Sequence, residues 1–500
     1  MNRFSRFAFV GASIGLGLFS LAVMTLGADK QTAKKSKVPA KSAATNARRG
    51  RADPGPLELF KSPDGKHNGW KVKLSGGRRL ATPAFAEGKL FLGGGFGSHE
   101  FYALDAETGR IVWQYDTKDD GPTAAVVADG YVGFNTESCE LEILDLAGKP
   151  VWKKWLGDPL MSIPAIADGM VYMAYPDSKG AHDHKLACFD LKTGDSRWEN
   201  TIPGEIITAP VVQDDRVYAA SLEGTLSCFD SRTGNLLWSE SKNATSSPVV
   251  WKDRCLFSRR TETKIAEGNR TVKQQSEQIA SRGTGNTDSV RDIAATSRTA
   301  DYLDYSKRAK SRKETAAQKA DDGVGFGGAF KGGGKISQAM SNLGQASVCG
   351  VWSYQGSKPF IYRERLYAAM ADKVVCVDPA TEKLLWEKKF HSDEPGKRGG
   401  TELLDAALSP PALVNGKMFL GTSDGSVLCL SAETGDLLWR VNIGESIAFQ
   451  PAVAGGRVFV ATESGSLFGI KTGDSQDDGW FMWGANAAHT GSLPTNNKEK

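Results

Sequence analysis

The sequence is poor in the residues and motifs that most often carry catalysis. Histidine occurs six times in 500 residues, and no Gly-x-Ser-x-Gly segment is present, so a serine hydrolase has no support. A Cys-x-x-Cys-His segment is also absent, which excludes a haem attached in the c-type manner. The letters Gly-x-Gly-x-x-Gly do occur at 323–328. They lie in a glycine-rich stretch without a preceding strand, which predicts a linker rather than a nucleotide site.

Positive charge is scarce in the body of the chain. The formal net charge is +4, but residues 1–28 carry +2, residues 29–53 carry +6 and residues 262–346 carry +4, which leaves −8 for the remainder. A protein that binds nucleic acid through its folded body needs a basic face on that body. The charge distribution therefore predicts no nucleic-acid partner.

The N-terminus has the pattern of an export signal. Arg3 and Arg6 precede an apolar run that ends near Ala28, so residues 1–28 are predicted to be a signal peptide. The run, at about twenty residues, is also long enough to remain as a membrane anchor, and no cysteine follows it for lipidation. Residues 29–55 are predicted to be a disordered basic linker. We expect an exported protein of the periplasm or cell envelope, which contacts the membrane only through an uncleaved N-terminus.

Cysteine is limited to seven residues. Four of them occupy one shared position in a repeated phrase: Cys188, Cys228, Cys376 and Cys429. A position that recurs within a repeat is a packing position, so the sequence predicts small buried thiols rather than disulfide bonds. The odd count leaves at least one cysteine without a partner inside the chain.

That phrase recurs five times, and CFDSRTGNLLW at 228–238 is one clear copy. Its Asp can accept hydrogen bonds from turn amides, and its Thr-Gly closes the turn with a residue that tolerates positive φ. Strand-like alternation surrounds the turn, which predicts a hairpin with the Trp on its second strand. We expect the Trp side chains to dock between neighbouring repeats, and these are Trp113, Trp152, Trp198, Trp238, Trp386 and Trp439.

The spacing of these tryptophans predicts an all-β propeller. A repeat of about forty residues with strand content is typical of propeller blades, each a four-stranded antiparallel sheet. A second marker is a proline near the start of each repeat, at positions 83, 164, 210, 248, 359, 411 and 451, and one further repeat lacks it. The count is therefore eight blades, with seven as the alternative.

The propeller is expected to span residues 56–492, with residues 493–500 as a disordered tail. The strand-like residues 69–77 precede the first repeat and resemble the strand that the last repeat lacks. We expect them to complete the last blade and close the ring, which removes its open edges. The segment WGANAAHTGS, from Trp483 to Ser492, is interpreted as a strand that seals the last blade, with His489 in a structural role.

One repeat is too long. Residues 262–346 are predicted to be an insertion in the fifth blade, because the two flanking prolines, Pro248 and Pro359, stand far more than one repeat apart. Residues 288–320 are rich in alanine, and Val290 and Ile293 begin a partial helical stripe. We expect a helix there, followed by a flexible glycine-rich arm. Such an excursion either carries a partner contact or is a solvated decoration.

The repeats closely resemble those of pyrroloquinoline-quinone (PQQ) propellers, whose Ala-x-Asp-x-x-Thr-Gly-x-x-x-Trp core is most complete in ALDAETGRIVW at 103–113. One class with this repeat, the quinoprotein alcohol dehydrogenases, holds PQQ and calcium over the propeller axis with a vicinal disulfide. This sequence has no Cys-Cys pair. The other class is the non-catalytic BamB-like propellers, which have eight blades and an export signal. Because both classes share the repeat, the resemblance is more specific for fold than for function.

The weak metal candidates are His182 and His184, since two His two residues apart can point the same way on a strand. No third ligand accompanies them in the sequence. The function predicted is an exported scaffold that binds envelope proteins without catalysis, as a monomeric propeller. The alternatives are a PQQ-dependent dehydrogenase that uses PQQ and calcium, or a binder of PQQ or another small ligand without turnover.

Overall fold

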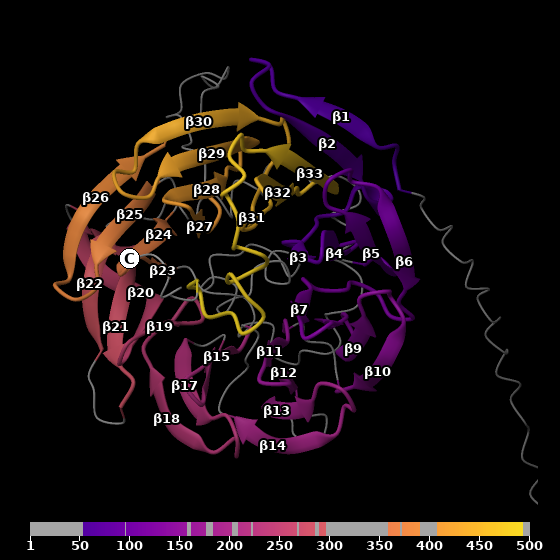
Figure 1. The fold of residues 1–500 in the computed structure, drawn as a ribbon. Helices are drawn as coiled ribbons and strands as arrows, with labels where there is room; N and C mark the ends of the chain where they lie inside the picture. Colours follow the sequence, from indigo (N-terminus) through magenta and orange to yellow (C-terminus); the bar gives the residue numbers. More distant parts are fainter. Residues whose placement is uncertain are drawn as a thin grey trace, which may run out of the picture. The chain divides into compact units, whose positions relative to one another are not determined.

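The computed structural model describes residues 54–95, 97–157, 162–176, 184–202, 209–221, 224–267, 270–285, 290–296, 359–370, 373–390 and 408–493. These residues form eight sheets that stand around a common axis (Figure 1). Seven blades contain four antiparallel strands in chain order from the axis outward, and the eighth is a five-stranded sheet. The prediction of an all-β propeller with eight blades is confirmed, and seven is excluded. The predicted export signal, most of the basic linker and residues 494–500 lie outside the described residues.

The strands are short at the axis and longer at the rim. Blades one to four comprise β3 (Ala84–Ala86), β4 (Lys89–Gly93), β5 (Glu100–Asp105), β6 (Ile111–Asp116); β7 (Val126–Ala128), β8 (Tyr131–Phe134), β9 (Glu140–Asp145), β10 (Pro150–Trp155); β11 (Ala165–Ala167), β12 (Met170–Pro176), β13 (His184–Asp190), β14 (Ser196–Ile202); and β15 (Val211–Gln213), β16 (Arg216–Ala220), β17 (Thr225–Asp230), β18 (Leu236–Ser241). Blades five to seven comprise β19 (Val249–Trp251), β20 (Arg254–Glu267), β21 (Arg270–Gly283), β22 (Arg291–Thr296); β23 (Pro359–Tyr362), β24 (Arg365–Met370), β25 (Lys373–Asp378), β26 (Lys383–Lys389); and β27 (Ala412–Val414), β28 (Lys417–Gly421), β29 (Ser426–Ser431), β30 (Leu437–Asn442).

The eighth blade joins the two ends of the propeller. It contains β31 (Ala452–Ala454), β32 (Arg457–Ala461) and β33 (Ser466–Lys471), and its fourth strand is β2 (Asn68–Lys73) from the N-terminal side. The predicted closure by residues 69–77 is therefore confirmed, since β2 pairs with β33 from Gly69 to Lys73. A fifth strand, β1 (Glu58–Lys61), pairs with the outer edge of β2. Because β2 leads directly into blade one and pairs within blade eight, it connects the first blade to the last and closes the ring.

A β-bulge precedes the tryptophan of the fourth strand in six blades. The register between third and fourth strands shifts by one residue there, and the extra residues are Val112, Val151, Arg197, Leu237, Leu385 and Leu438. A bulge bends its strand and increases the local twist, so it re-aims the next side chain. It also interrupts the outer edge of the blade, which discourages pairing with another chain.

The fifth blade corrects the predicted insertion. Its strands β21 and β22 both lie within residues 262–346, so the blade is complete at Thr296 and the additional residues come between blades five and six. The predicted helix is wrong where the structure describes it, because Arg291–Thr296 is strand β22. Pairing with β21 supplies main-chain hydrogen bonds that outweigh the weak helical stripe. Residues 297–358, with the predicted glycine-rich arm, lie outside the described residues.

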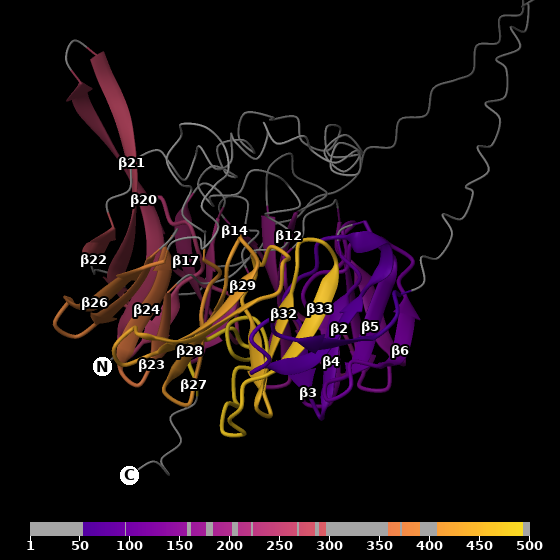
Figure 2. The ribbon, with the colours of Figure 1, turned by 90° about the horizontal axis from the view of Figure 1, so that it is seen from above.

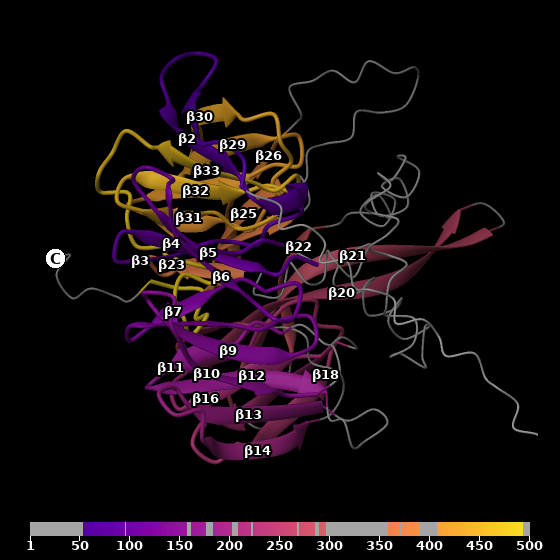
Figure 3. The ribbon, with the colours of Figure 1, turned by 90° about the vertical axis from the view of Figure 1, so that its right-hand side faces the viewer.

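Strands β20 and β21 are each 14 residues long. They extend as a hairpin beyond the other blades, on the face opposite the C-terminal segment (Figures 2 and 3). Across the described ranges the sole helical element is the short η1 (Ser75–Gly77). None of that part of the chain forms a helix long and apolar enough to cross a membrane.

Candidate functional site

Fourth-strand tryptophans reach into the next blade, and Trp439 of blade seven does so by ring contact with His67 of blade eight, with centroids 4.5 Å apart. The indole Nε1 of Trp70, Trp113, Trp152, Trp198 and Trp238 donates a hydrogen bond of 2.8–3.1 Å to a main-chain carbonyl of the next blade, on Ala106, Leu146, Leu191, Ser231 and Thr284 respectively. The indole Nε1 of Trp386 donates no such bond. In its blade the Tyr367 hydroxyl donates to the corresponding carbonyl of the next blade, that of Ala432. These bonds lie on the face of the ring that carries the Thr-Gly turns.

The glycine of that turn serves the neighbouring indole as well as the turn itself. Gly109, Gly148, Gly194 and Gly435 all have positive φ. A Cβ added to any of them would lie 2.5–2.8 Å from the tryptophan ring of the preceding blade, which is closer than atoms can approach. The repeated phrase thus supplies both halves of each junction: a flat ring on one blade and a bare turn on the next.

On the opposite face of the ring, carboxylates connect neighbouring blades. Glu445, between blades seven and eight, accepts hydrogen bonds from the hydroxyls of Thr462 and Ser464, in the loop between β32 and β33, and of Ser466 at the start of β33. It also pairs with Lys71 at 2.9 Å. Burial opposes ionisation, but these donors outweigh it and lower the pKa of Glu445 to about 2. The carboxylate therefore stays charged. It joins the end of blade seven to the β32–β33 loop and to strand β2, both of blade eight.

The junction between blades one and two repeats this arrangement. Asp119 accepts from the hydroxyl of Thr136 and from both the amide and the hydroxyl of Ser138, the last two at 2.7 and 2.8 Å. The two loops share the letters Thr-Glu-Ser, at 136–138 and 462–464. The sequence analysis missed this second repeated motif, although the duplicated letters were available as a signal.

The carboxylate of Glu445 predicts an acid-sensitive ring. Its folded pKa of about 2 lies below the ordinary value of 4.5 for a glutamate, so its contribution is fully present above pH 4.5 and is lost as the pH falls toward 2. We expect the free energy of unfolding to decline across this window, and Glu445→Gln to remove part of that decline. Urea titrations at pH 3, 5 and 7 measure it. The exposed Glu107→Gln is the control, and an identical pH profile for both variants would contradict the assignment.

On the face opposite the β20–β21 hairpin, the axis of the ring is occupied by the C-terminal segment (Figures 2 and 3). Residues Trp480 to Gly491 cross the centre of the propeller (Figure 1). Five inner-strand amides donate to carbonyls of this segment at 2.7–3.0 Å: Phe85 to Phe481, Ile166 to Ala487, Val212 to Ala488, Ile361 to Gly491 and Val453 to Trp480. These amides come from blades one, three, four, six and eight. The prediction that this segment is a strand sealing the last blade is therefore wrong, because its carbonyls are shared among many blades.

The side chains of the segment complete the packing. Trp480, Trp483 and His489 are at most 2% exposed. The two ring nitrogens of His489 lie 3.0 Å from the carbonyl oxygens of Trp483 and Pro164, and burial lowers the pKa of His489. Since Pro164 directly precedes the inner strand β11, His489 binds the segment to the N-terminal end of that strand.

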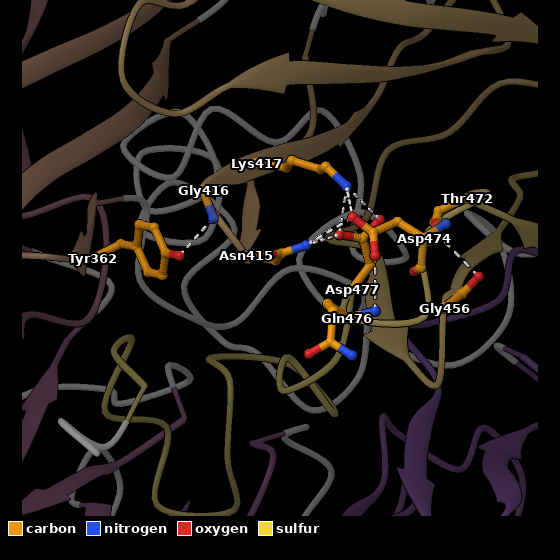
Figure 4. Close-up of polar contacts among 9 residues, drawn as sticks. All are labelled: Tyr362, Asn415, Gly416, Lys417, Gly456, Thr472, Asp474, Gln476 and Asp477. Atoms are coloured by element: carbon orange, nitrogen blue, oxygen red, sulfur yellow. Dashed lines mark hydrogen bonds and ion pairs between the residues drawn. The ribbon is translucent and has the colours of Figure 1, made fainter. Parts of the chain in front are cut away.

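An ion-pair cluster anchors the root of the segment (Figure 4). Lys417, at the start of β28, donates to both carboxylate oxygens of Asp477 at 2.9 and 3.1 Å and to Asp474 at 2.7 Å. Asn415 also donates to Asp477, at 2.9 Å. Asp477 is fully buried, so its charge depends on these partners. The cluster joins blade seven to the residues that leave blade eight for the axis.

The predicted metal ligands are not brought together. His182 lies outside the described residues, and His184 is buried at the start of β13. In the described part of the chain, no group of three His, Cys, Asp or Glu side chains could hold a metal ion. Six cysteines are buried free thiols, among them the four of the repeated phrase. Burial raises the pKa of Cys188 to about 11 and that of Cys228 to about 12, which makes these thiols unreactive.

At the end of the axis that holds Trp480–Gly491, the described polar groups are bonded to the protein itself and do not fit the quinone and calcium that the resemblance implies. The centre of the ring holds Trp480–Gly491, as described above. Beside it, the Thr82 hydroxyl donates to the Gln450 carbonyl, and the Gln450 amide donates to Pro411 and accepts from Gly484. These polar groups already have protein partners, so they are not available to a bound cofactor.

Comparison with known proteins agrees with this architecture. The sequence matches a family model described as outer membrane protein assembly factor BamB over residues 35–145, 140–310 and 370–492. The chain belongs to this family. It is therefore a BamB-like PQQ-repeat propeller, related to the quinoprotein alcohol dehydrogenases.

Individual curated relatives cover only parts of this BamB-like chain. BamB of Nitrosomonas eutropha is 22% identical over 232 residues, which span 36% of this chain and 56% of that protein. The dehydrogenase subunit of the quinone alcohol dehydrogenase of Gluconacetobacter polyoxogenes is 35% identical over 106 residues, 19% of this chain and 14% of that protein. The chain thus spans little more than half of one relative and a small part of the other.

Solved structures share the fold at low sequence identity. Quinohemoprotein alcohol dehydrogenase from Comamonas testosteroni superposes with a TM-score of 0.52 at 14% identity, over 83% of this chain and 76% of that one. The computationally designed Ika8 protein gives the same TM-score at 13% identity, over 80% of this chain and 98% of that one. A natural enzyme and a designed protein match equally well, so the likeness concerns the propeller alone.

Proposed function

We propose that this protein is an exported, non-catalytic scaffold that binds other proteins of the cell envelope. Membership of the family described as an outer membrane assembly factor supports this proposal, and so does the match to BamB of Nitrosomonas eutropha. The observation that carries it is the occupied end of the axis, because the resemblance to quinoprotein dehydrogenases implies a quinone over the propeller axis. With that end of the axis occupied by Trp480–Gly491 of the same chain, the proposal assigns envelope partners to the rim and the loops.

The rim offers suitable contact residues. Trp155 on β10 is 61% exposed and Leu59 on β1 is 93% exposed. Exposed aromatic and apolar side chains at a polar rim are typical of surfaces that contact other proteins. The place of action would be the periplasm or the envelope, with the membrane reached only through the N-terminal segment.

Crosslinking in cells tests the scaffold role. A photo-crosslinking amino acid at position 155 of the full chain is expected to capture one protein, or a small set, from the envelope fraction. A crosslinker in place of Val453, which is fully buried on β31, is the control and should capture none. Labelling spread evenly over cytoplasmic proteins would contradict the proposal.

A second candidate is a PQQ-dependent dehydrogenase, favoured by the 35% identity to the Gluconacetobacter polyoxogenes subunit. Calorimetric titration of the full chain with PQQ and calcium, followed by dye reduction with short alcohols, separates the two. The scaffold proposal expects no turnover. Binding with dye reduction would make the protein an enzyme, and binding without reduction would make it a ligand binder.

A further inference from the structure

The C-terminal segment contacts the ring as a ligand contacts its receptor. Its residues from Trp480 to Gly491 contain no regular strand or helix, and carbonyls of this segment accept from amides of five different blades. A blade strand would instead pair with a single neighbouring strand along its length. The inner strands therefore present a set of inward-facing amide donors at the axis, and a peptide supplies the acceptors.

The contacts of this peptide are specific as well as numerous. His489 places both ring nitrogens 3.0 Å from carbonyls, one of them on Pro164 of blade three. The Gly484 amide donates to Gln450 of blade eight at 2.9 Å. Trp480 stacks edge to face with Phe360 of blade six, with ring centroids 5.5 Å apart. One short segment thus contacts side chains and main chain of separate blades.

Covalent connection to the ring passes through one exposed turn. Ser475 and Gln476 are exposed, and they lie between β33 and the buried Asp477. Beyond this turn the segment contacts the ring through the ion pair of Asp477 with Lys417, hydrogen bonds and packing, and the described residues hold no disulfide to it. The geometry has the form of a receptor with its ligand attached by a tether.

We propose that the axis of this propeller is a peptide-binding site, occupied in cis by residues 480–491, and that it recognises a polypeptide segment with two indoles and a histidine. The site takes main-chain carbonyls on the inner-strand amides and the imidazole on the Pro164 carbonyl. This inference stands on the axial contacts alone and does not depend on the envelope role. Its consequence is that the same segment, offered as a free peptide, competes for the axis.

Cleavage of the folded full chain tests this site. A protease recognition sequence inserted between Ser475 and Gln476 lets the segment be cut after folding. Size-exclusion chromatography is expected to show the fragment eluting with the ring. A labelled peptide of residues 476–493, added in excess, should then replace it, as followed by fluorescence anisotropy.

Two peptide variants make the test specific. His489→Ala removes the imidazole contact with the Pro164 carbonyl and is expected to weaken competition at least tenfold. Gln476→Ala changes an exposed residue and should compete like the natural peptide. The proposal is overturned by equal competition from the His489→Ala peptide, or by release of the fragment without rebinding. Retention with no exchange at all would overturn it too, because the segment would then be an integral part of the core.

Discussion

Replacing Lys417 with alanine is expected to lower the free energy of unfolding by about 3–5 kcal/mol, because it leaves a buried charge without its partner. Asp477 is fully buried and receives two of its three side-chain hydrogen bonds from Lys417. Burial opposes the charge of Lys417, yet the two aspartates raise its pKa, so the ammonium is charged at neutral pH. Denaturant titration followed by tryptophan fluorescence measures the loss.

A matched control is available in the neighbouring blades. Lys388 pairs with Asp436 at 2.8 Å, a distance like that of the Lys417 pairs, but the Asp436 side chain is 63% exposed. Exposed ion pairs contribute about 0–1 kcal/mol, so Lys388→Ala should change stability by no more than this. Similar losses for both variants would show that burial of Asp477 does not set the strength of the anchor. Asp477→Asn with Lys417→Ala should recover part of the loss, since no buried charge remains.

Replacing Trp238 with alanine is expected to cost about 3–5 kcal/mol of stability, the range for deleting a buried aromatic side chain. Trp238 is 7% exposed, and its indole donates to the Thr284 carbonyl at 3.0 Å. The guanidinium of Arg282 lies over its ring, 3.5 Å from the centroid. The substitution removes the packing, the hydrogen bond and this cation–π contact together.

The control for this substitution is Trp155→Ala. Trp155 is 61% exposed on the outer strand of blade two, so its removal exposes little new surface and should cost less than about 1 kcal/mol. Thermal and denaturant unfolding of both variants, compared with the natural chain, measure the difference. A change in the free energy of unfolding below about 1 kcal/mol for Trp238→Ala would contradict the docking of this tryptophan against the next blade.

The repeated phrase made the ring readable from the sequence alone. Its Asp, Thr-Gly and Trp lie within a dozen residues, as in 228–238, where Asp230 accepts from the turn amide of Thr233 and Trp238 donates to the next blade. Local hydrogen bonds and local alternation decide such hairpins, so their form does not depend on distant parts of the chain. Closure by residues 69–77 was predictable for the same reason, because the missing strand had a recognisable copy.

The fifth blade was less readable, because its third and fourth strands lack the phrase. Arg291–Thr296 has alanines and a partial helical stripe, yet it pairs with Glu277–Ser281 of β21. Strand formation there depends on an edge supplied by another part of the sheet, and short segments follow such pairing over weak helical propensity. The boundaries of the insertion were misplaced for that reason.

The sequence by itself determined the kind of blade and the tryptophan junctions between blades, because both rest on residues that recur in each repeat, and it favoured eight blades over seven. Only the tertiary structure decided what fills the axis and what holds it there. The partners of His489 and Phe481 are Pro164 and Phe85, hundreds of residues away along the chain. They meet because the ring closes and directs its inner amides toward one line, a geometry that no local pattern records.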